Sequence, residues 1–299
     1  MKIHATPVLL RMPYKLKSGP NPLIRLVVSY LAGDSPNLPL FLVTVSASGT
    51  GQQAVVPQTP CRRRLPNRGG LTNDRSKCLK RQYRDRLNSL RAVDDLVGNL
   101  VDALVRNGEL DNTVFIFTSD NGFFYGQHRL TDKVLGYEES IRVPLYISAP
   151  GFPKQATWRT AINNDLAPTV TDFAGITPGL TVDGRSLLPL MRNTSERNWR
   201  KRFLVEYLGT VQSSLRPPKV PFSAVRTTNL SQSTPVNQFY MEWHDDPGSK
   251  EFYDLSSDRY QISSQHNNSA WASVRNTLAG WLSQLRSCGG GSCQGLENN

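Results

Sequence analysis

The residues best suited to chemistry in this sequence are a carboxylate, an amide and a glycine that directly follow an apolar run. Asp120, Asn121 and Gly122 come soon after Thr113–Thr118, whose residues are β-branched or aromatic. Carboxylate and amide oxygens are hard ligands that Ca²⁺ or Mg²⁺ prefers, and glycine lets the backbone turn sharply beside an ion. The pattern predicts a metal site. The alternative is an ordinary Asp-Asn-Gly turn, which is common.

An α/β unit would position this triplet. Tyr83–Arg106 carries apolar side chains at three- and four-residue steps, which predicts an amphipathic helix, and Asn107-Gly108 is a typical stop. Thr113–Thr118 is apolar without alternation, which predicts a parallel strand buried on both faces. Functional groups gather at the carboxyl ends of strands in such sheets, where the triplet would lie.

The rest of the chain divides around this unit. Residues 1–80 are predicted to be irregular, basic and in part disordered, with one strand at Pro39–Val45 and a long loop from Ser46 to about Lys80. Residues 81–190 would form the α/β part, with a further strand at Val143–Ser148 and a helix at Leu166–Ala174. Asp165 would cap that helix and Gly175 would end it.

Residues 191–299 are predicted to form a small antiparallel sheet with one covering helix at about Trp271–Leu285. Its expected strands are Phe203–Tyr207, Phe222–Thr227, Phe239–Trp243 and Phe252–Leu255.

An ordered set of motifs strongly resembles the sulfatase family. The first is Asp111–Gly122 (DNTVFIFTSDNG). The others follow in order as Gly126-Gln127-His128, Asp132-Lys133, Tyr137–Pro144, Ala149-Pro150-Gly151, Asp165–Thr169, Asp183–Pro189 and Phe252–Leu255. The ending Arg286–Cys293 looks like the tail of fungal and other secreted arylsulfatases. The resemblance covers roughly Arg81–Cys293, with a faint extension to the strand at Pro39.

The resemblance implies an alkaline-phosphatase-like α/β fold, with a three-layer parallel or mixed sheet, that hydrolyses sulfate esters. In that family a cysteine of a C-x-P-S-R motif becomes formylglycine, and Ca²⁺ neutralises the sulfate. By position, Asp120 and Asn121 match the metal pair and Lys133 matches the sulfate-binding lysine. His128 falls in a loop over the site. The alternatives are a solvated surface lysine and a structural imidazole.

The nucleophile of that family has no counterpart in these 299 residues. Neither Cys61 nor Cys78 is followed by proline and arginine in the C-x-P-S-R pattern, and no serine starts an equivalent pentad. The family's first pair of metal aspartates is absent, and Ser46–Gly49 stands where it places Pro-His. We therefore expect an N-terminally truncated fold, unable to form formylglycine and inactive alone, because residues that act as a unit leave little rate when lost.

The composition leaves other readings open. The net charge is +11, with much of the excess between Cys61 and Arg91. A basic module that binds nucleic acid or a sulfated glycan is one alternative, although sparse aromatics make base stacking, and so nucleic acid, a poor prediction. A related metal-dependent phospho-ester hydrolase is another. The expected substrate by resemblance is a sulfate-ester small molecule or glycan. Oligomeric state is not indicated.

Compartment signals in the sequence are mixed. Cys288 and Cys293 flank a flexible Gly-Gly-Gly-Ser segment that could close a small disulfide loop, and sequons occur at Asn193, Asn229 and Asn267. Members of the family are usually secreted or lysosomal. No convincing signal peptide and no membrane-spanning run is present, so localisation stays open.

Overall fold

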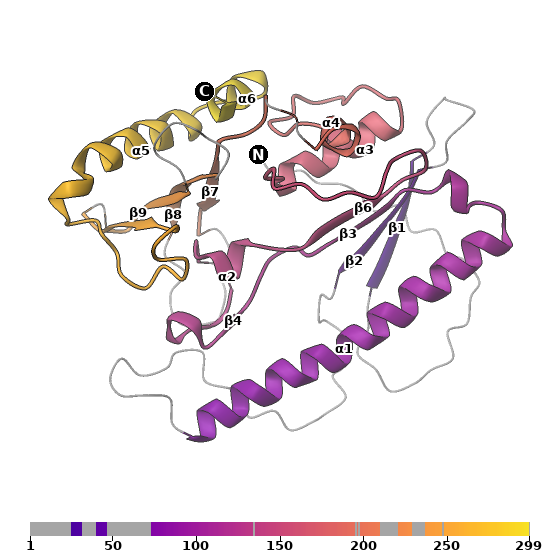
Figure 1. Ribbon diagram of the computed structural model, residues 1–299, viewed down its shortest axis with the longest axis horizontal. Helices are drawn as coiled ribbons and strands as arrows, with labels where there is room; N and C mark the ends of the chain where they lie inside the picture. The colour runs from indigo at the N-terminus through magenta and orange to yellow at the C-terminus, as the bar shows by residue number, and fades with distance from the viewer. Residues whose placement is uncertain are drawn as a thin grey trace.

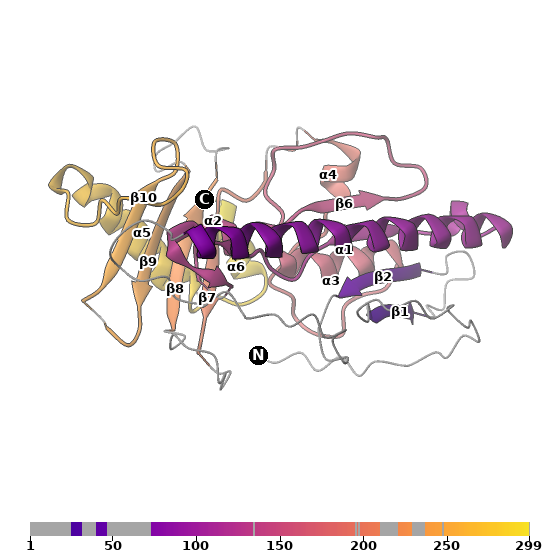
Figure 2. The ribbon, with the colours of Figure 1, turned by 90° about the horizontal axis from the view of Figure 1, so that it is seen from below.

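The computed structural model describes two strands near the N-terminus and most of the chain from residue 73 onward. The described residues are 25–31, 40–46, 73–133, 135–194, 196, 198–209, 221–228, 237–246 and 248–298. Two β-sheet regions lie side by side, and the long helix α1 (Asn73–Arg106) runs along their lower side (Figure 1). Seen from below, α1 crosses most of the molecule (Figure 2).

The first region holds the strands that lead to the candidate site. β1 (Arg25–Leu31) pairs antiparallel with β2 (Leu40–Ser46), β3 (Phe115–Thr118) pairs antiparallel with β6 (Leu145–Ser148), and β2 lies beside β3. Helix α3 (Leu166–Phe173) covers one face of β3. The buried contacts between them are made by Val114, Ile116, Val170 and Ala174. This core fixes the end of β3.

Three expectations about these strands are wrong. β3 is not parallel to its neighbour β6, and it is not buried on both faces, because Phe117 remains 37% exposed. The direction was missed because an apolar run indicates hydrophobicity but not the direction of the partner strand. The exposure of Phe117 follows because α3 covers only one face of this strand. The segment 25–31, expected to be irregular, is strand β1, which pairs along its whole length with β2, from Arg25 opposite Ser46 to Leu31 opposite Leu40. The strand expected at Pro39–Val45 is confirmed as β2.

Helix α1 begins ten residues before the predicted start. Residues 73–80, expected to belong to a loop, are helical, since Lys77, Leu79 and Lys80 have good helix propensity and extend the helix without an apolar period. The remainder of the predicted loop and the irregular segment before β1 lie outside the described residues. Gly108 has φ +70°, as a left-handed stop requires. The apolar stripe of α1 is half-exposed: Tyr83, Leu87 and Leu90 are between 46% and 54% accessible.

The second region is an antiparallel sheet, as predicted, and its strands lie in the order β10-β9-β8-β7. Its strands are β7 (Arg202–Tyr207), β8 (Phe222–Thr227), β9 (Gln238–Trp243) and β10 (Lys250–Asp254). One face packs against Tyr137 and Ile141 at the two ends of α2 (Glu138–Ile141). The other face packs against α5 (Ala272–Leu285), the predicted covering helix. The sheet is therefore covered on both faces.

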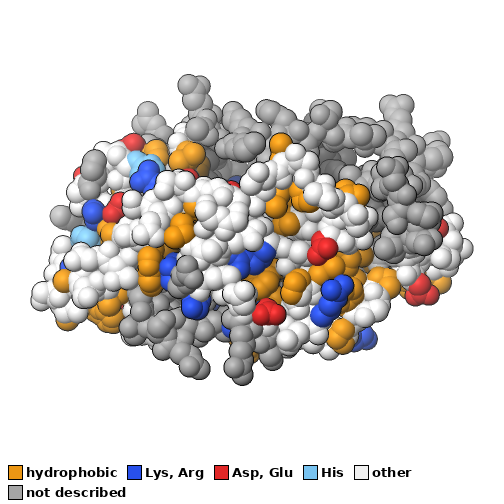
Figure 3. Space-filling view, turned by 90° about the horizontal axis from the view of Figure 1, so that it is seen from above, with side chains coloured by type: hydrophobic (Ala, Val, Ile, Leu, Met, Phe, Trp, Pro, Cys, Tyr) orange, Lys and Arg blue, Asp and Glu red, His pale blue; other side chains and the backbone are white. Residues whose placement is uncertain are grey.

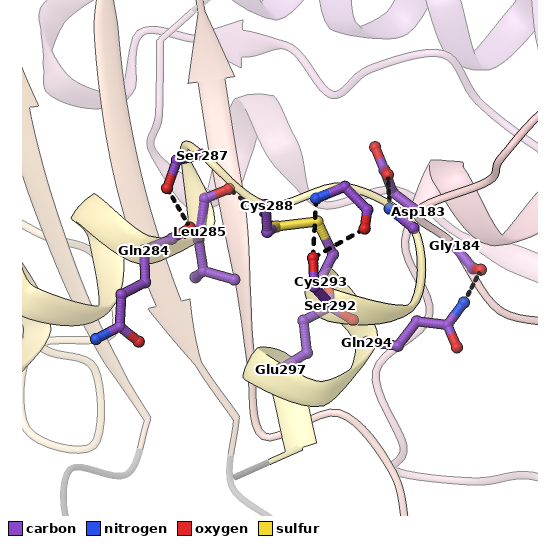
Figure 4. The surroundings of a disulfide bond; sticks show 12 residues. Asp183, Gly184, Gln284, Leu285, Ser287, Cys288, Ser292, Cys293, Gln294 and Glu297 are labelled. Carbon is purple, nitrogen blue, oxygen red and sulfur yellow. Dashed lines mark hydrogen bonds between the residues drawn. A yellow bond between two sulfur atoms is a disulfide. The ribbon is translucent and has the colours of Figure 1, made fainter.

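The chain ends in a helix that sequence reasoning missed. α6 (Gly291–Asn298) contains two glycines, which disfavour a helix, but the predicted disulfide between Cys288 and Cys293 fixes its start, with Cα atoms 5.1 Å apart (Figure 4). The Gly290 N–H donates to Asp183 Oδ1 at 2.7 Å, which ties this corner to the first region. The start of α6 is thus held by a disulfide and by a hydrogen bond from the loop that the disulfide closes to Asp183.

A buried ionic network joins α6 to the start of α3. The Arg200 guanidinium donates to both carboxylate oxygens of Asp165, at 2.7 and 2.8 Å, and its Nε donates to Glu297 at 2.9 Å. Arg200 and Asp165 are completely buried. Asp165 occupies the N-cap position of α3 as predicted, but its side chain makes no capping hydrogen bond there, because its carboxylate accepts from the backbone N–H groups of Ile162 and Arg185 instead. Gly175, with φ +67°, ends α3 as predicted.

The remaining elements are short and connect these parts. They are 3₁₀ turns at Leu110–Asn112, Gln127–Arg129, Asn163–Asp165 and Ser269–Trp271, strands β4 (Phe124–Tyr125) and β5 (Thr131–Asp132), and helix α4 (Leu188–Arg192). In the described part of the chain, no helix is both long and apolar enough to cross a membrane. On the face opposite α1, basic side chains are scattered among neutral and apolar ones (Figure 3).

Candidate functional site

The candidate site begins where β3 ends, and a close backbone approach shapes it. The Thr118 hydroxyl donates to the Pro144 carbonyl at 2.9 Å, and the Gly122 N–H donates to the Ser140 carbonyl at 2.8 Å. A Cβ atom on Gly122 would collide with the backbone carbonyl of Glu139. Glycine is therefore required here by space, and it presses the Asp-Asn-Gly turn against α2.

The turn presents Asp120 and Asn121 to Lys133. The Lys133 ammonium lies 2.6 Å from Asn121 Oδ1 and 3.6 Å from Asp120 Oδ2. The amide nitrogen of Asn121 donates to the Gly122 carbonyl at 2.8 Å, which directs its oxygen toward the lysine. The Asp120 side chain is 74% exposed and that of Lys133 is 41% exposed. Three of the four residues predicted from the sequence thus meet at one solvent-accessible corner.

Lys133 reaches this corner because it directly follows a short hairpin. β4 and β5 pair antiparallel, with Phe124 opposite Asp132, so the chain turns back toward the end of β3. The N-terminal part of α1 supports the hairpin: the Tyr83 and Tyr125 rings meet edge to face at 5.2 Å, and the Arg86 guanidinium lies 4.3 Å from the Phe123 ring. One cation of the basic stretch is therefore engaged within the fold.

His128 lies in the same hairpin but contacts a different set of residues. Its Nε2 lies 3.3 Å from Glu139 Oε2, and its ring stacks on Tyr137 at 4.2 Å with an interplanar angle of 13°. The side chain is 11% exposed, and the backbone has φ +50°, a left-handed conformation that non-glycine residues rarely adopt. His128 is thus held on the α2 side, and no contact joins it to Lys133 within the described chain.

Three residues around His128 were not singled out from the sequence. Glu139 and Tyr137 hold its ring, and Glu251 of β10 accepts from the Tyr137 hydroxyl at 3.1 Å. Burial, then the Glu251 charge, raises the pKa of Tyr137 well above its ordinary value, so the phenol stays a donor. Tyr137 and Glu139 belong to a family motif, which could have flagged them. Glu251 lies 114 residues away, and no local signal points to it.

The oxygen donors at this corner fit a hard cation in type but not in number. Ca²⁺ takes roughly six to eight oxygen ligands. Within the described residues, no group of three or more His, Cys, Asp or Glu side chains could hold a metal ion. Asp120 and Asn121 supply two side-chain oxygens, and the Lys133 ammonium lies against both. These residues can therefore form part of a metal site, with the other ligands coming from elsewhere.

Comparison with known proteins identifies the family. The sulfatase family model matches residues 27–176, and the model of the N-sulphoglucosamine sulphohydrolase C-terminal region matches residues 126–288. The chain belongs to the sulfatase family. It is 36% identical over 252 residues to the N-acetylglucosamine-6-sulfatase of Capra hircus, an alignment that covers 75% of this chain and 44% of the relative. The chain thus spans less than half the length of this relative.

Solved structures share the fold of this chain. One, of a protein in complex with its substrate D-glucosamine-2-N,6-O-disulfate, is 27% identical with a TM-score of 0.64, over 77% of this chain and 44% of the other. The phosphonate monoester hydrolase of Agrobacterium radiobacter is 25% identical with a TM-score of 0.54, over 65% and 39%. The predicted alkaline-phosphatase-like α/β fold is confirmed, and the family match extends further toward the N-terminus than the motifs did.

Proposed function

We propose that this chain is the part of a glycan sulfatase that holds the metal and the sulfate group of a sulfated glucosamine. The observation that carries the proposal is the meeting of Lys133 with Asp120 and Asn121 at the end of β3. The glucosamine assignment rests on the N-acetylglucosamine-6-sulfatase relative and on the solved structure in complex with a glucosamine disulfate.

The chemistry of a sulfate monoester explains the residue types. The ester is anionic from ground state to transition state, so fixed positive charge around its oxygens lowers the barrier. Lys133, partly exposed at the corner, would bind one sulfate oxygen. A Ca²⁺ ion, when bound by Asp120, Asn121 and further ligands, supplies additional charge neutralisation. His128, oriented by Glu139 and by stacking on Tyr137, would serve the leaving group after movement of the hairpin.

The same chain is proposed to have no turnover on its own. Its 299 residues contain no C-x-P-S-R pentad from which formylglycine could form. Purified protein should hydrolyse neither an aryl sulfate nor N-acetylglucosamine 6-sulfate, with or without Ca²⁺. Robust metal-dependent release of sulfate from either compound would overturn this part of the proposal.

Binding tests the remaining part directly. We expect D-glucosamine-2-N,6-O-disulfate to bind in calorimetry with Ca²⁺ present, and Lys133→Ala to weaken binding about tenfold to a hundredfold, since a hydrogen bond to a charged group contributes about 1.5–3 kcal/mol. The control is Lys154→Ala, which removes an exposed lysine elsewhere. Equal affinities for all three proteins would refute the role of Lys133.

A phospho-ester hydrolase is the second candidate, because a phosphonate monoester hydrolase shares the fold. The two candidates differ in ligand charge and shape, so a glucosamine 6-phosphate titration separates them. Tighter binding of the phosphate than of the 6-sulfate would favour the second candidate. The polyanion-binding alternative concerns the basic stretch 61–91, of which residues 61–72 lie outside the described part of the chain, and it stays a prediction.

A further inference from the structure

The turn that leads into α5 carries an exposed asparagine, Asn267, whose side chain makes no hydrogen bond within the described residues. Asn267, Asn268 and Ser269 follow one another on this turn, and all three are exposed. The Asn268 side chain accepts from the Ala270 N–H at 3.0 Å and so caps the short 3₁₀ turn. The side chains of Asn267 and Ser269, by contrast, make no hydrogen bond with any residue in the described ranges.

The turn itself is firmly attached to the C-terminal sheet. The Gln265 N–H donates to the Phe252 carbonyl at 2.8 Å, and the Asn268 N–H donates to the Gln265 carbonyl at 3.1 Å. On the other side, the Trp271 ring lies 5.3 Å from the Phe252 ring, which is completely buried. Asn267 is therefore an exposed residue on a turn that is anchored on both sides.

We propose that Asn267 is a modification site that carries an N-linked oligosaccharide. Asparagine in the pattern N-x-S is the acceptor for transfer from a lipid-linked oligosaccharide diphosphate. The Asn267 amide nitrogen forms a bond to the anomeric carbon, that carbon's bond to the diphosphate oxygen breaks, and the nitrogen gives up one proton as the lipid diphosphate leaves. The Cys288–Cys293 disulfide supports passage of this chain through the secretory pathway, because disulfides form in that oxidising compartment, where the transfer also occurs.

A glycan at Asn267 is compatible with the candidate site. Trp271, which follows the turn, packs on the face of the sheet that α5 covers. Tyr137, which precedes α2, and Ile141, the last residue of α2, pack on the opposite face. α5 begins at the outer left edge of the molecule in Figure 1, away from α2. The sheet would thus stand between the oligosaccharide and the Asp120 corner, leaving that corner accessible.

The other two sequons make a useful comparison. Asn193 directly follows α4, and its backbone is fixed on both sides: its N–H donates to the Pro189 carbonyl at 2.9 Å, and its carbonyl accepts from the Glu196 N–H at 3.1 Å. The sequon at Asn229 lies outside the described residues. Of the three, Asn267 is the asparagine for which the structure shows an exposed and hydrogen-bond-free side chain, so the proposal is confined to it.

The test is translation of the full chain, behind a secretory leader, into microsomes that contain the transferase. In the protease-protected fraction, the peptide with Asn267 should carry a glycan, and enzymatic removal in H₂¹⁸O should convert Asn267 to ¹⁸O-labelled aspartate. Asn267→Gln and Ser269→Ala should each abolish the increase in apparent mass that one glycan gives on a gel, whereas Ser269→Thr should retain it. The matched control Asn276→Gln, an exposed asparagine of α5 outside any sequon, should change nothing.

Both outcomes are decisive because the protected fraction contains translocated chains whether or not they fold. Unmodified Asn267 peptide as the dominant species there would overturn the proposal. Native, non-denatured protein offers a second measurement: a glycan on this exposed turn should be removed by endoglycosidase without unfolding, and resistance until denaturation would contradict the exposed position.

Discussion

Replacement of Asp165 by asparagine tests whether the buried ionic network stabilises the junction between the two sheet regions. Asp165 is completely buried and accepts two hydrogen bonds from Arg200, at 2.7 and 2.8 Å. Asparagine has nearly the same shape but one acceptor oxygen, so its NH₂ group would face a donor. Arg200 would keep Glu297, 2.9 Å from its Nε, as its remaining counter-charge.

Removing one partner of a buried ion pair costs about 3–5 kcal/mol, because the other charge stays desolvated. Since Glu297 still compensates part of the Arg200 charge, we expect Asp165→Asn to lower the free energy of unfolding by about 3 kcal/mol, at the lower end of that range. With a urea slope of about 2–3 kcal/mol/M, the midpoint should fall by at least about 1 M. Circular dichroism during a urea titration measures this shift.

Asp172→Asn is the matched control. Asp172 is an exposed residue of α3 that accepts one hydrogen bond, at 2.6 Å, from the Ser186 hydroxyl. The same change of one charge should alter stability by about 0.5 kcal/mol or less at this surface position. If Asp165→Asn shifts the midpoint no more than Asp172→Asn, the network does not stabilise the fold and the reasoning is refuted.

Three further predictions concern the site corner, the C-terminus and pH. Gly122→Ala should destabilise by about 1–3 kcal/mol and speed hydrogen exchange at its own amide, because the new Cβ collides with the Glu139 carbonyl; unchanged exchange would contradict the close approach. Cys293→Ser should cost about 2 kcal/mol and leave α6 exchanging rapidly, and full protection would contradict it. The pKa of His266 is lowered by burial and then by nearby cations, so its stabilising effect is complete above its unfolded pKa and is lost as pH falls through its folded pKa. Thermal melts should therefore show wild type losing more stability than His266→Gln between pH 7 and pH 5, and parallel losses would contradict it.

Local patterns predicted the secondary structure well where the period of apolar residues matched an element. The strands of the C-terminal sheet and helix α5 lie within a residue or two of their expected positions. α6 was missed because its stability comes from the disulfide and from Glu297, both contacts that helix propensity ignores. The direction of β3 was missed because an apolar run contains no information about its partner strand.

The candidate site was also predicted only in part. The motif order placed Asp120, Asn121 and Lys133 together. Lys133 follows Asn121 by twelve positions, and the β4–β5 hairpin between them brings the two side chains to 2.6 Å. The residues around His128 could be predicted only in part, because Glu251 comes from strand β10, which is distant in the sequence. Long-range contacts of this kind depend on how the two regions dock, which no local pattern reports. The metal and catalytic roles of these four residues remain predictions.

The ionic network also constrains the order in which this molecule can fold. Arg200 and Glu297 are 97 residues apart, whereas Arg200 and Asp165 are 35 residues apart. Domains generally begin to fold while the ribosome is still adding residues. Glu297 pairs with both Arg185 and Arg200, so a nascent chain that buries these two cations near Asp165 would lack one of their two counter-charges until α6 docks. Ribosome-bound chains that stop before α6 should therefore be distinctly more sensitive to protease than chains that extend past it.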